Sequence, residues 1–248
     1  MNTLAGQRLW EIDSVRGLAL VLMIIYHLLY DLNVFFGFSV AYNEGLFYFI
    51  GKAAAALFIL VAGISCAFSN NNALRGIKLI LWGYLIFLVT SLVLPGSNIV
   101  FGILQFLGVC FLLYPVFKNL TPSLLLTIGA AIIFTGQLTS QLSVSHNWLA
   151  PLGFYGPDFS SVDYFPLIPW LGIFLMGIAI RKTVYKENKS LFNQAGNYFK
   201  PLAAVGKRTL TIYLIHQPLI LGLLYLVLNP RGLWDMLGKL VVALTVLK

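Results

Sequence analysis

Long apolar runs alternate with short polar segments along the whole chain, and their lengths match the thickness of a lipid bilayer. A transmembrane helix needs about 20 mostly apolar residues, whereas the strands of a membrane barrel are shorter and alternate in polarity. The expected spans are Ile12–Phe36, Phe47–Phe68, Ile77–Leu94, Ile99–Phe117, Pro122–Leu138, Tyr164–Ile180 and Thr209–Leu228. An eighth run, Leu233–Leu247, contains Asp235 and Lys239, so it either spans with a tilt or lies in the interface. The pattern predicts an all-α, polytopic transmembrane helix bundle of seven to eight spans, with residues 1–248 forming a single domain.

The composition supports a lipid environment. Charged residues make up only 10% of the chain and hydrophobic residues 59%, and the mean hydropathy is +0.88, whereas soluble proteins carry about 25% charged residues. A soluble fold of this size could not bury so much apolar surface, so we expect the chain to be surrounded by lipid. Cys66 and Cys110 lie inside apolar runs, which indicates buried thiols and no disulfide or metal framework. The first ten residues lack the apolar segment of a cleaved signal peptide, and we expect none.

Basic residues gather in alternate loops, and this asymmetry predicts the orientation of the chain. Arg8 and Arg16 flank the start of the first span, and the second and fourth loops carry Arg75, Lys78 and Lys118. The sixth loop contains Arg181, Lys182, Lys186, Lys189, Lys200, Lys207 and Arg208. The loops between them carry only the acidic residues Glu44, Asp158 and Asp163, and Arg231 and Lys52 are the exceptions to this alternation. Positively charged loops stay in the cytoplasm, so we expect a cytoplasmic N-terminus. The same asymmetry explains most of the net charge of +8, and no nucleic-acid partner is expected.

Four ionisable side chains lie on one side of the first span: Asp13, Arg16, His27 and Asp31. Arg16 and His27 are eleven residues apart, which is about three helical turns or about 16 Å. Asp13 precedes Arg16 by three residues and Asp31 follows His27 by four, and both spacings bring side chains to the same helix face. Ionisable groups inside a membrane are costly and mark function more often than not. We therefore expect this row of side chains to face the bundle interior or a hydrated cavity.

The two ends of this row favour different chemistry. Arg16, near the cytoplasmic surface, is suited to hold a phosphate or a carboxylate. His27 lies deeper, where an imidazole can take a proton from a hydroxyl or an amine, with Asp31 fixing the other ring nitrogen. In the alternative interpretation, His27 and Asp31 only satisfy each other between helices, and Asp13 and Arg16 form an interfacial ion pair.

Several segments together resemble known membrane acyltransferases. The spacing Arg16-x10-His27 fits the Arg/Lys-x10-His pattern of the membrane acyltransferase family 3. The stretch Glu-Ile-Asp-x-x-Arg-Gly-Leu-Ala, with Met23-Ile24 and His27-x-x-x-Asp31, resembles the bacterial branch of the heparan-alpha-glucosaminide N-acetyltransferase catalytic-domain family. Four later segments are similar to that branch in order: Leu57–Ser65, Phe101–Gln105, Phe165–Trp170 and Ile212–Pro218.

This resemblance implies a multi-pass protein of the bacterial inner membrane. It implies transfer of an acyl group, normally acetyl, from cytoplasmic acyl-CoA (acetyl-CoA) to a glycan, a lipid-linked molecule or another hydroxyl or amine acceptor at the outer side. No metal is implied. Arg16, with Asp13, Lys207 and Arg208, would then bind the donor, and His27 would be the general base or the acyl carrier. Membrane lipids are expected partners, and a homodimer is also considered.

The remaining polar residues have two interpretations each. His216 and Gln217, next to Pro218 in the seventh span, either contact the thioester and acceptor or make interhelical hydrogen bonds. Gln105 either donates to a developing oxyanion or makes such a structural bond, and the second is favoured. The basic residues around Lys207 either attract the phosphates of coenzyme A or only set topology and bind anionic lipid, and the second is again favoured.

Two further function classes stay open at this point. A proton-coupled transporter also uses intramembrane Arg, His and Asp side chains, although the chain lacks the inverted repeat and paired broken spans of such carriers. A non-catalytic membrane scaffold would leave the ionisable row of the first span without a purpose.

In the long outer loop 139–163, Trp148 and Tyr155 either stack on a sugar or belong to the interfacial aromatic belt, and His146 is expected to be exposed.

Overall fold

The computed structural model describes residues 9–93, 98–139, 142, 144–187, 189–192 and 198–229. Its helices are α1 (Trp10–Val34), α2 (Gly45–Cys66), α3 (Asn72–Val93), α4 (Ile103–Phe117), α5 (Pro122–Thr139), η1 (Ala150–Leu152), α6 (Leu167–Thr183), α7 (Lys200–Lys207) and α8 (Thr209–Leu228). Within these described residues the only extended pairing is an isolated bridge between Phe101 and Tyr164. The all-α prediction is therefore confirmed for this part of the chain. The run Leu233–Leu247 lies outside the described residues.

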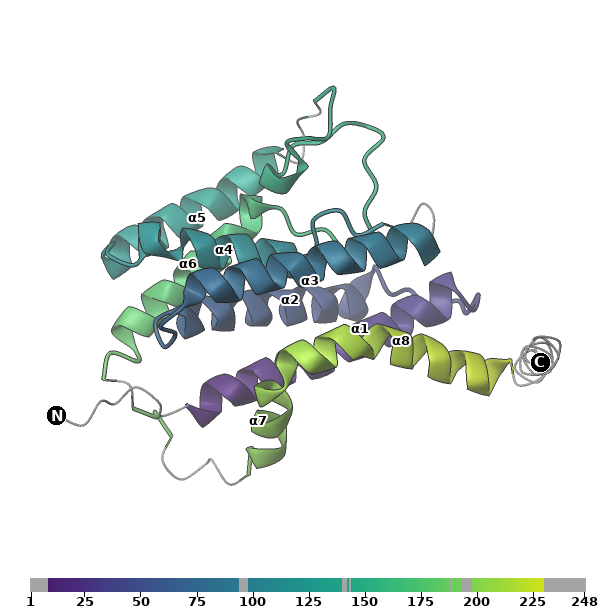
Figure 1. The fold of residues 1–248 in the computed structure, drawn as a ribbon, viewed down its shortest axis with the longest axis horizontal. Helices are drawn as coiled ribbons and strands as arrows, with labels where there is room; N and C mark the ends of the chain where they lie inside the picture. Colours follow the sequence, from purple (N-terminus) through teal and green to yellow (C-terminus); the bar gives the residue numbers. More distant parts are fainter. Residues whose placement is uncertain are drawn as a thin grey trace, which may run out of the picture.

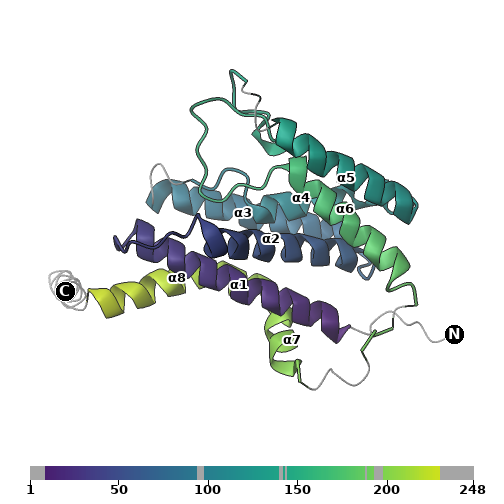
Figure 2. The same cartoon turned by 180° about the vertical axis from the view of Figure 1, so that it is seen from behind.

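The long helices lie side by side along the longest dimension of the molecule (Figures 1 and 2). Helices α1 and α8 flank one side of the bundle, α5 and α6 the other, and α2 to α4 lie between them. Helix α7 runs across this direction and packs against the first half of α1. Four helices, α1, α2, α3 and α8, are long and apolar enough to cross a membrane. The protein is thus a multi-pass membrane protein. The other three expected spans correspond to α4, α5 and α6, with 15, 18 and 17 residues, and the number of seven to eight spans stays a prediction.

Helices α4 and α6 are short because the chain ahead of each one leaves the helical conformation inside the bundle. Helix α4 has 15 residues, about 22 Å at 1.5 Å per residue, which is less than the hydrocarbon thickness of about 30 Å. The segments 98–102 and 161–165 instead run beside each other. The backbone N–H of Phe165 donates to the carbonyl of Phe101 at 2.9 Å, and that of Val162 donates to Asn98 at 3.2 Å. Non-helical backbone is tolerated at membrane depth when its polar groups are paired within the protein in this way.

Glycines bring the backbones of adjacent helices into contact at four interfaces. A Cβ added at Gly63 of α2 would lie 2.2 Å from the carbonyl oxygen of Phe174, and one at Gly177 of α6 would lie 2.2 Å from that of Leu60. The same close approach occurs at the pairs Gly17 and Gly206 (α1 and α7), Gly76 and Gly108 (α3 and α4), and Gly129 and Gly172 (α5 and α6). In lipid, helix association depends on such close van der Waals packing.

We expect Gly177→Ala to destabilise the bundle by about 1–3 kcal/mol, because the added methyl group would push α6 away from α2. Thermal unfolding in detergent micelles would measure this change. Gly222→Ala in α8 is the matched control, since its added Cβ would meet no neighbouring helix within 4 Å among the described residues. Equal melting temperatures for the two variants would contradict the proposed role of the glycine contact.

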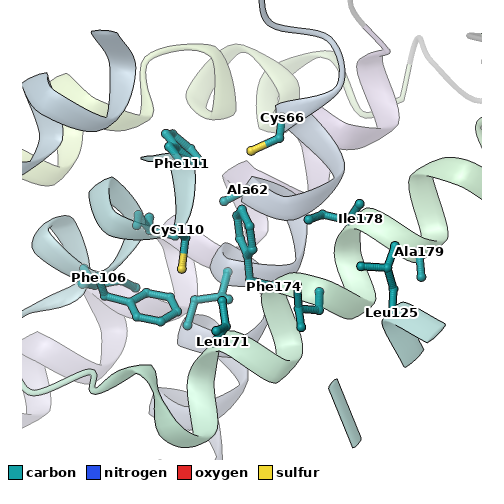
Figure 3. Close-up of a cluster of buried hydrophobic side chains, with 14 of the residues drawn as sticks. Ala62, Cys66, Phe106, Cys110, Phe111, Leu125, Leu171, Phe174, Ile178 and Ala179 are labelled. Atoms are coloured by element: carbon teal, nitrogen blue, oxygen red, sulfur yellow. The ribbon is translucent and has the colours of Figure 1, made fainter. Parts of the chain in front are cut away.

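The apolar core lies between α2, α4, α5 and α6 (Figure 3). Figure 3 shows the rings of Phe106, Phe111 and Phe174 directed into the space between these helices, and the centroids of Phe111 and Phe174 are 6.2 Å apart. Cys66 and Cys110 are fully buried free thiols in the same core, as the apolar sequence around them predicted. The start of α4 belongs to this core, and Tyr213 of α8 packs against it.

Candidate active site

A cavity of about 920 Å³ opens between the ends of α1, α2, α3, α7 and α8, within the range of about 300–1,000 Å³ that is usual for small-molecule sites. Four basic side chains line it: Arg16, Arg75, Lys78 and Lys207. One carboxylate, that of Asp13, lines it as well, so the cavity carries an excess of positive charge. These helix ends lie on the side of the bundle where α7 and the loop between α2 and α3 are found (Figure 1). Farther in, the lining consists of Leu104, Leu107, Phe111 and Tyr213.

Arg16 is held in the wall of this cavity by its own helix and by α2. Its Nη1 donates to Asp13 Oδ1 at 2.7 Å, and its Nη2 donates to Ser65 Oγ at 2.7 Å. Ser65 Oγ in turn donates to the carbonyl of Val61, so its direction is fixed. Arg16 therefore forms the ion pair with Asp13 that the helical spacing allowed, and Arg16 also lines the cavity. Asp13 is buried, and its Oδ2 has no hydrogen-bond partner.

The other basic residues of the predicted donor patch behave differently from one another. Lys207 lines the cavity, whereas Arg208, at the junction of α7 and α8, does not. Arg181 donates to the backbone carbonyl of Tyr185, and Lys182 donates to that of Leu120. Of these residues of the sixth loop, only Lys207 lines the cavity. Arg75 and Lys78 of α3 line it as well. Sequence spacing could not predict that Arg75 and Lys78 of α3 line the same cavity as Lys207 of α7, because this depends on tertiary packing.

Deeper in the bundle, His27 of α1 and His216 of α8 form a pair. Their ring centroids are 4.9 Å apart and the rings meet edge to face at 89°. His27 Nδ1 is 2.9 Å from the carbonyl oxygen of Met23, and His216 Nδ1 is 2.5 Å from that of Tyr213. Because a carbonyl can only accept, both Nδ1 atoms must be the donors, and each neutral ring keeps its lone pair on Nε2. His216 is buried and its Nε2 has no hydrogen-bond partner, whereas His27 is half-buried.

The described hydrogen bonds do not join Asp31 to His27, and the role of Asp31 in orienting His27 stays a prediction. The Nδ1–H of His27 donates to the carbonyl of Met23, four residues earlier on the same helix. Asp31 Oδ1 instead accepts from Gln217 Nε2 at 2.7 Å, which joins α1 to α8. The carboxyl is fully buried and its Oδ2 has no hydrogen-bond partner. For Gln217 the interhelical interpretation is therefore the one realised.

A third polar group, that of Asp163, reaches this region from the segment ahead of α6. Asp163 Oδ2 accepts from the backbone N–H of Ile103 at 3.3 Å and from Tyr213 Oη at 3.5 Å. The ring of Tyr213 lies 5.3 Å from that of His216 and also lines the cavity. Burial raises the pKa of the Asp163 carboxyl, and attraction to nearby His27 opposes that rise. Sequence reasoning counted Asp163 only as a loop charge and did not single out Tyr213, although each lies in or beside a segment that resembled the acyltransferases.

Gln105 lies next to Asp163 at the start of α4. Its Oε1 accepts from the backbone N–H of Gly102 at 3.1 Å, which closes the first turn of its own helix. Its Nε2 is buried and has no hydrogen-bond partner. The expected interhelical bond is therefore replaced by a helix cap, and a free donor remains inside the bundle.

The aromatic residues of the segment between α5 and α6 form two groups. Trp148 is 72% exposed and stacks on His146 with ring centroids 4.9 Å apart, whereas Tyr155 packs against Phe159 and Tyr164. Lys52 lies over the rings of Tyr48 and Trp170, 5.4 Å from each centroid.

Comparison with known proteins gave one match. The family model described as heparan-alpha-glucosaminide N-acetyltransferase, catalytic, covers residues 8–218. The matched region contains both histidines, the ion pair at Arg16, the four basic side chains of the cavity and Asp163. No curated protein and no solved structure matched the chain.

Proposed function

Since the chain belongs to the heparan-alpha-glucosaminide N-acetyltransferase catalytic-domain family, a family of membrane acetyltransferases, we propose that it transfers acetyl across the membrane. The donor is cytoplasmic acetyl-CoA, and the acceptor is a hydroxyl or amine, as of a glycan, at the outer side. One observation supports this proposal most strongly. The positively charged cavity extends to Tyr213, whose ring contacts that of His216 in the histidine pair. Tyr213 therefore connects the cavity and its basic side chains to the two histidines inside one bundle.

The cavity suits a donor that carries several phosphates at one end and a thioester at the other. Arg16 and Arg75 can bind phosphate oxygens with paired N–H groups, and Lys78 and Lys207 add point charges. Leu104, Leu107 and Phe111 supply an apolar path beyond them. A donor lying along this path would bring its acyl group toward Tyr213 and the histidines.

His27 is the proposed base for the acceptor. The bond from its Nδ1–H to Met23 holds the ring so that Nε2 is the nitrogen able to take a proton. The half-buried position of His27 leaves it more accessible than His216. Direct transfer to the acceptor and an acyl-histidine intermediate both start from this geometry.

The acceptor side is proposed to include the aromatic residues at the outer end of the bundle. Tyr26 and Tyr30 of α1 meet Tyr42 with ring centroids 6.2 and 5.1 Å apart. Together with the exposed Trp148, they supply flat faces on which a sugar ring can stack.

The experiment that tests this function uses the purified chain in detergent or nanodiscs with labelled acetyl-CoA and a panel of sugars and amino sugars. Release of free CoA that requires an acceptor, with label appearing on that acceptor, is the expected result. Absence of CoA release with every acceptor, together with solute uptake when the chain is placed in proton-loaded vesicles, would overturn the proposal in favour of a transporter.

We expect Arg16→Ala to raise the donor KM by about 10- to 100-fold, since hydrogen bonds to charged groups are each worth about 1.5–3 kcal/mol. Turnover at saturating donor should change less. Lys118→Ala is the control, because Lys118 is an exposed basic residue of the same predicted face that does not line the cavity. A large loss of turnover with an unchanged KM would move Arg16 from donor binding to the chemical step.

A further inference from the structure

The outer loop places an acidic side chain beside the histidine pair, and nothing described so far gives that residue a task. Asp163 is the last residue of the loop before the segment that leads into α6. Its position is fixed by backbone bonds on both sides, from Val162 to Asn98 and from Phe165 to Phe101. Ser161 strengthens this arrangement, since its Oγ accepts from the N–H of Val100 and donates to the carbonyl of Asp163. The carboxyl is therefore held in the bundle by its backbone.

The surroundings of Asp163 fit a carboxylate. The N–H of Ile103 and the hydroxyl of Tyr213 both point at Oδ2. Gly102 leaves the space that Oδ2 needs, since a Cβ there would lie 2.7 Å from this oxygen. Two donors and a missing side chain at this position together accommodate an anion.

Among the described residues, no lysine or arginine forms an ion pair with Asp163. Asp163 is linked to the histidine pair through Tyr213 and His216 and is attracted directly to His27. The other carboxyl of this region, that of Asp31, is bound by Gln217.

We propose that Asp163 is a positioning residue whose negative charge stabilises the imidazolium that forms at the histidine pair during acyl transfer. This inference rests on the proposed function. In the step concerned, the oxygen or nitrogen of the acceptor forms a bond to the thioester carbonyl carbon, and its proton moves to a histidine Nε2. The carbon–sulfur bond then breaks, the electron pair leaves with sulfur, and the imidazolium returns the proton to the thiolate of CoA. Asp163 exchanges no proton and acts only through its charge, which is effective in a water-poor interior.

The variant Asp163→Asn tests whether turnover depends on the charge of Asp163 or only on its hydrogen bonds. The asparagine oxygen can still accept from Ile103 and Tyr213, so a purely structural role would survive this change. Loss of the charge should lower turnover by about 10- to 100-fold, the effect expected for an opposite charge close to a titrating group. The donor KM and the affinity for acetyl-CoA should stay close to those of the unsubstituted chain, because Asp163 does not line the cavity.

Two further variants complete the test. Asp163→Glu keeps the charge and should recover much of the lost turnover. Asp158→Asn removes an exposed charge from the same loop and should leave turnover unchanged. Unchanged turnover in Asp163→Asn, or equal losses in the Asn and Glu variants, would overturn the proposal. Failure of the unsubstituted chain to release CoA would instead overturn the proposed function, and retained acetyl-CoA affinity in each variant would verify that it is folded.

Discussion

Alanine in place of His27 should lower acetyl-transfer turnover by about 10²- to 10⁴-fold, the usual contribution of a general base. The physical reason lies in the ring geometry. The Nδ1–H of His27 is anchored to Met23, which leaves Nε2 as the proton acceptor, and the partner ring of His216 lies 4.9 Å away. Removing the half-buried ring should cost little stability, since it makes no interhelical hydrogen bond within the described contacts.

The measurement is CoA release at saturating donor, with melting temperature as the check on folding. His146→Ala is the matched control, because His146 lies in the outer loop and contacts Trp148 and Ser145 only through exposed positions. His216→Ala should be compared in the same assay. Turnover of His27→Ala within a few-fold of the unsubstituted chain, with a large loss in His216→Ala, would show that the buried ring is the base and that the assignment of His27 is wrong.

Gln217→Leu should destabilise the bundle by about 1.5–3 kcal/mol, the cost of removing a hydrogen bond to a charged group. Asp31 is fully buried, and one of its oxygens already has no partner. Without Gln217 neither oxygen would be satisfied, and α1 would lose its described side-chain hydrogen bond to α8. Unfolding followed by circular dichroism in mixed micelles would measure the change.

A double-mutant cycle gives this prediction its control. Asp31→Leu combined with Gln217→Leu removes both partners together, so the double variant should be more stable than the sum of the single losses implies. Strictly additive losses would contradict the idea that the buried pair acts as a unit. Turnover should also be recorded, since a shift of α8 relative to α1 would separate the two histidine rings.

The apolar pattern predicted the location of the membrane helices better than their ends. The seventh span, Thr209–Leu228, has the bounds expected, because a basic residue precedes it and its hydropathy is uniform. The fourth and sixth spans start later than expected, at Ile103 and Leu167. The segments ahead of these helices are apolar enough to lie in the membrane. Hydropathy predicts that a segment is in the membrane, but it does not predict whether the backbone there is helical.

The ionisable row of the first span was also predictable, but the partners of its members were not. Helical spacing placed Arg16 next to Asp13, and that ion pair exists. The same reasoning assigned Asp31 to His27, whereas its partner is Gln217 on α8. Contacts within one helix follow from its period, whereas contacts between helices depend on how they pack. Asp163 was missed for the same reason, since it is brought to His27 by the pairing of two irregular segments.

The late start of α4, at Ile103 inside the bundle, has an electrostatic consequence for the transfer centre. A helix carries roughly half an elementary positive charge at its N-terminus, from peptide N–H groups that lack partners. For most membrane helices that end lies at the headgroups, where water and ions screen it. In α4 the first-turn N–H of Ile103 points at Asp163 inside the bundle. A helix terminus of this kind favours anions and opposes a cation at the histidines. The carboxylate of Asp163 therefore offsets the field of α4 as well, and the two features are expected to be needed together.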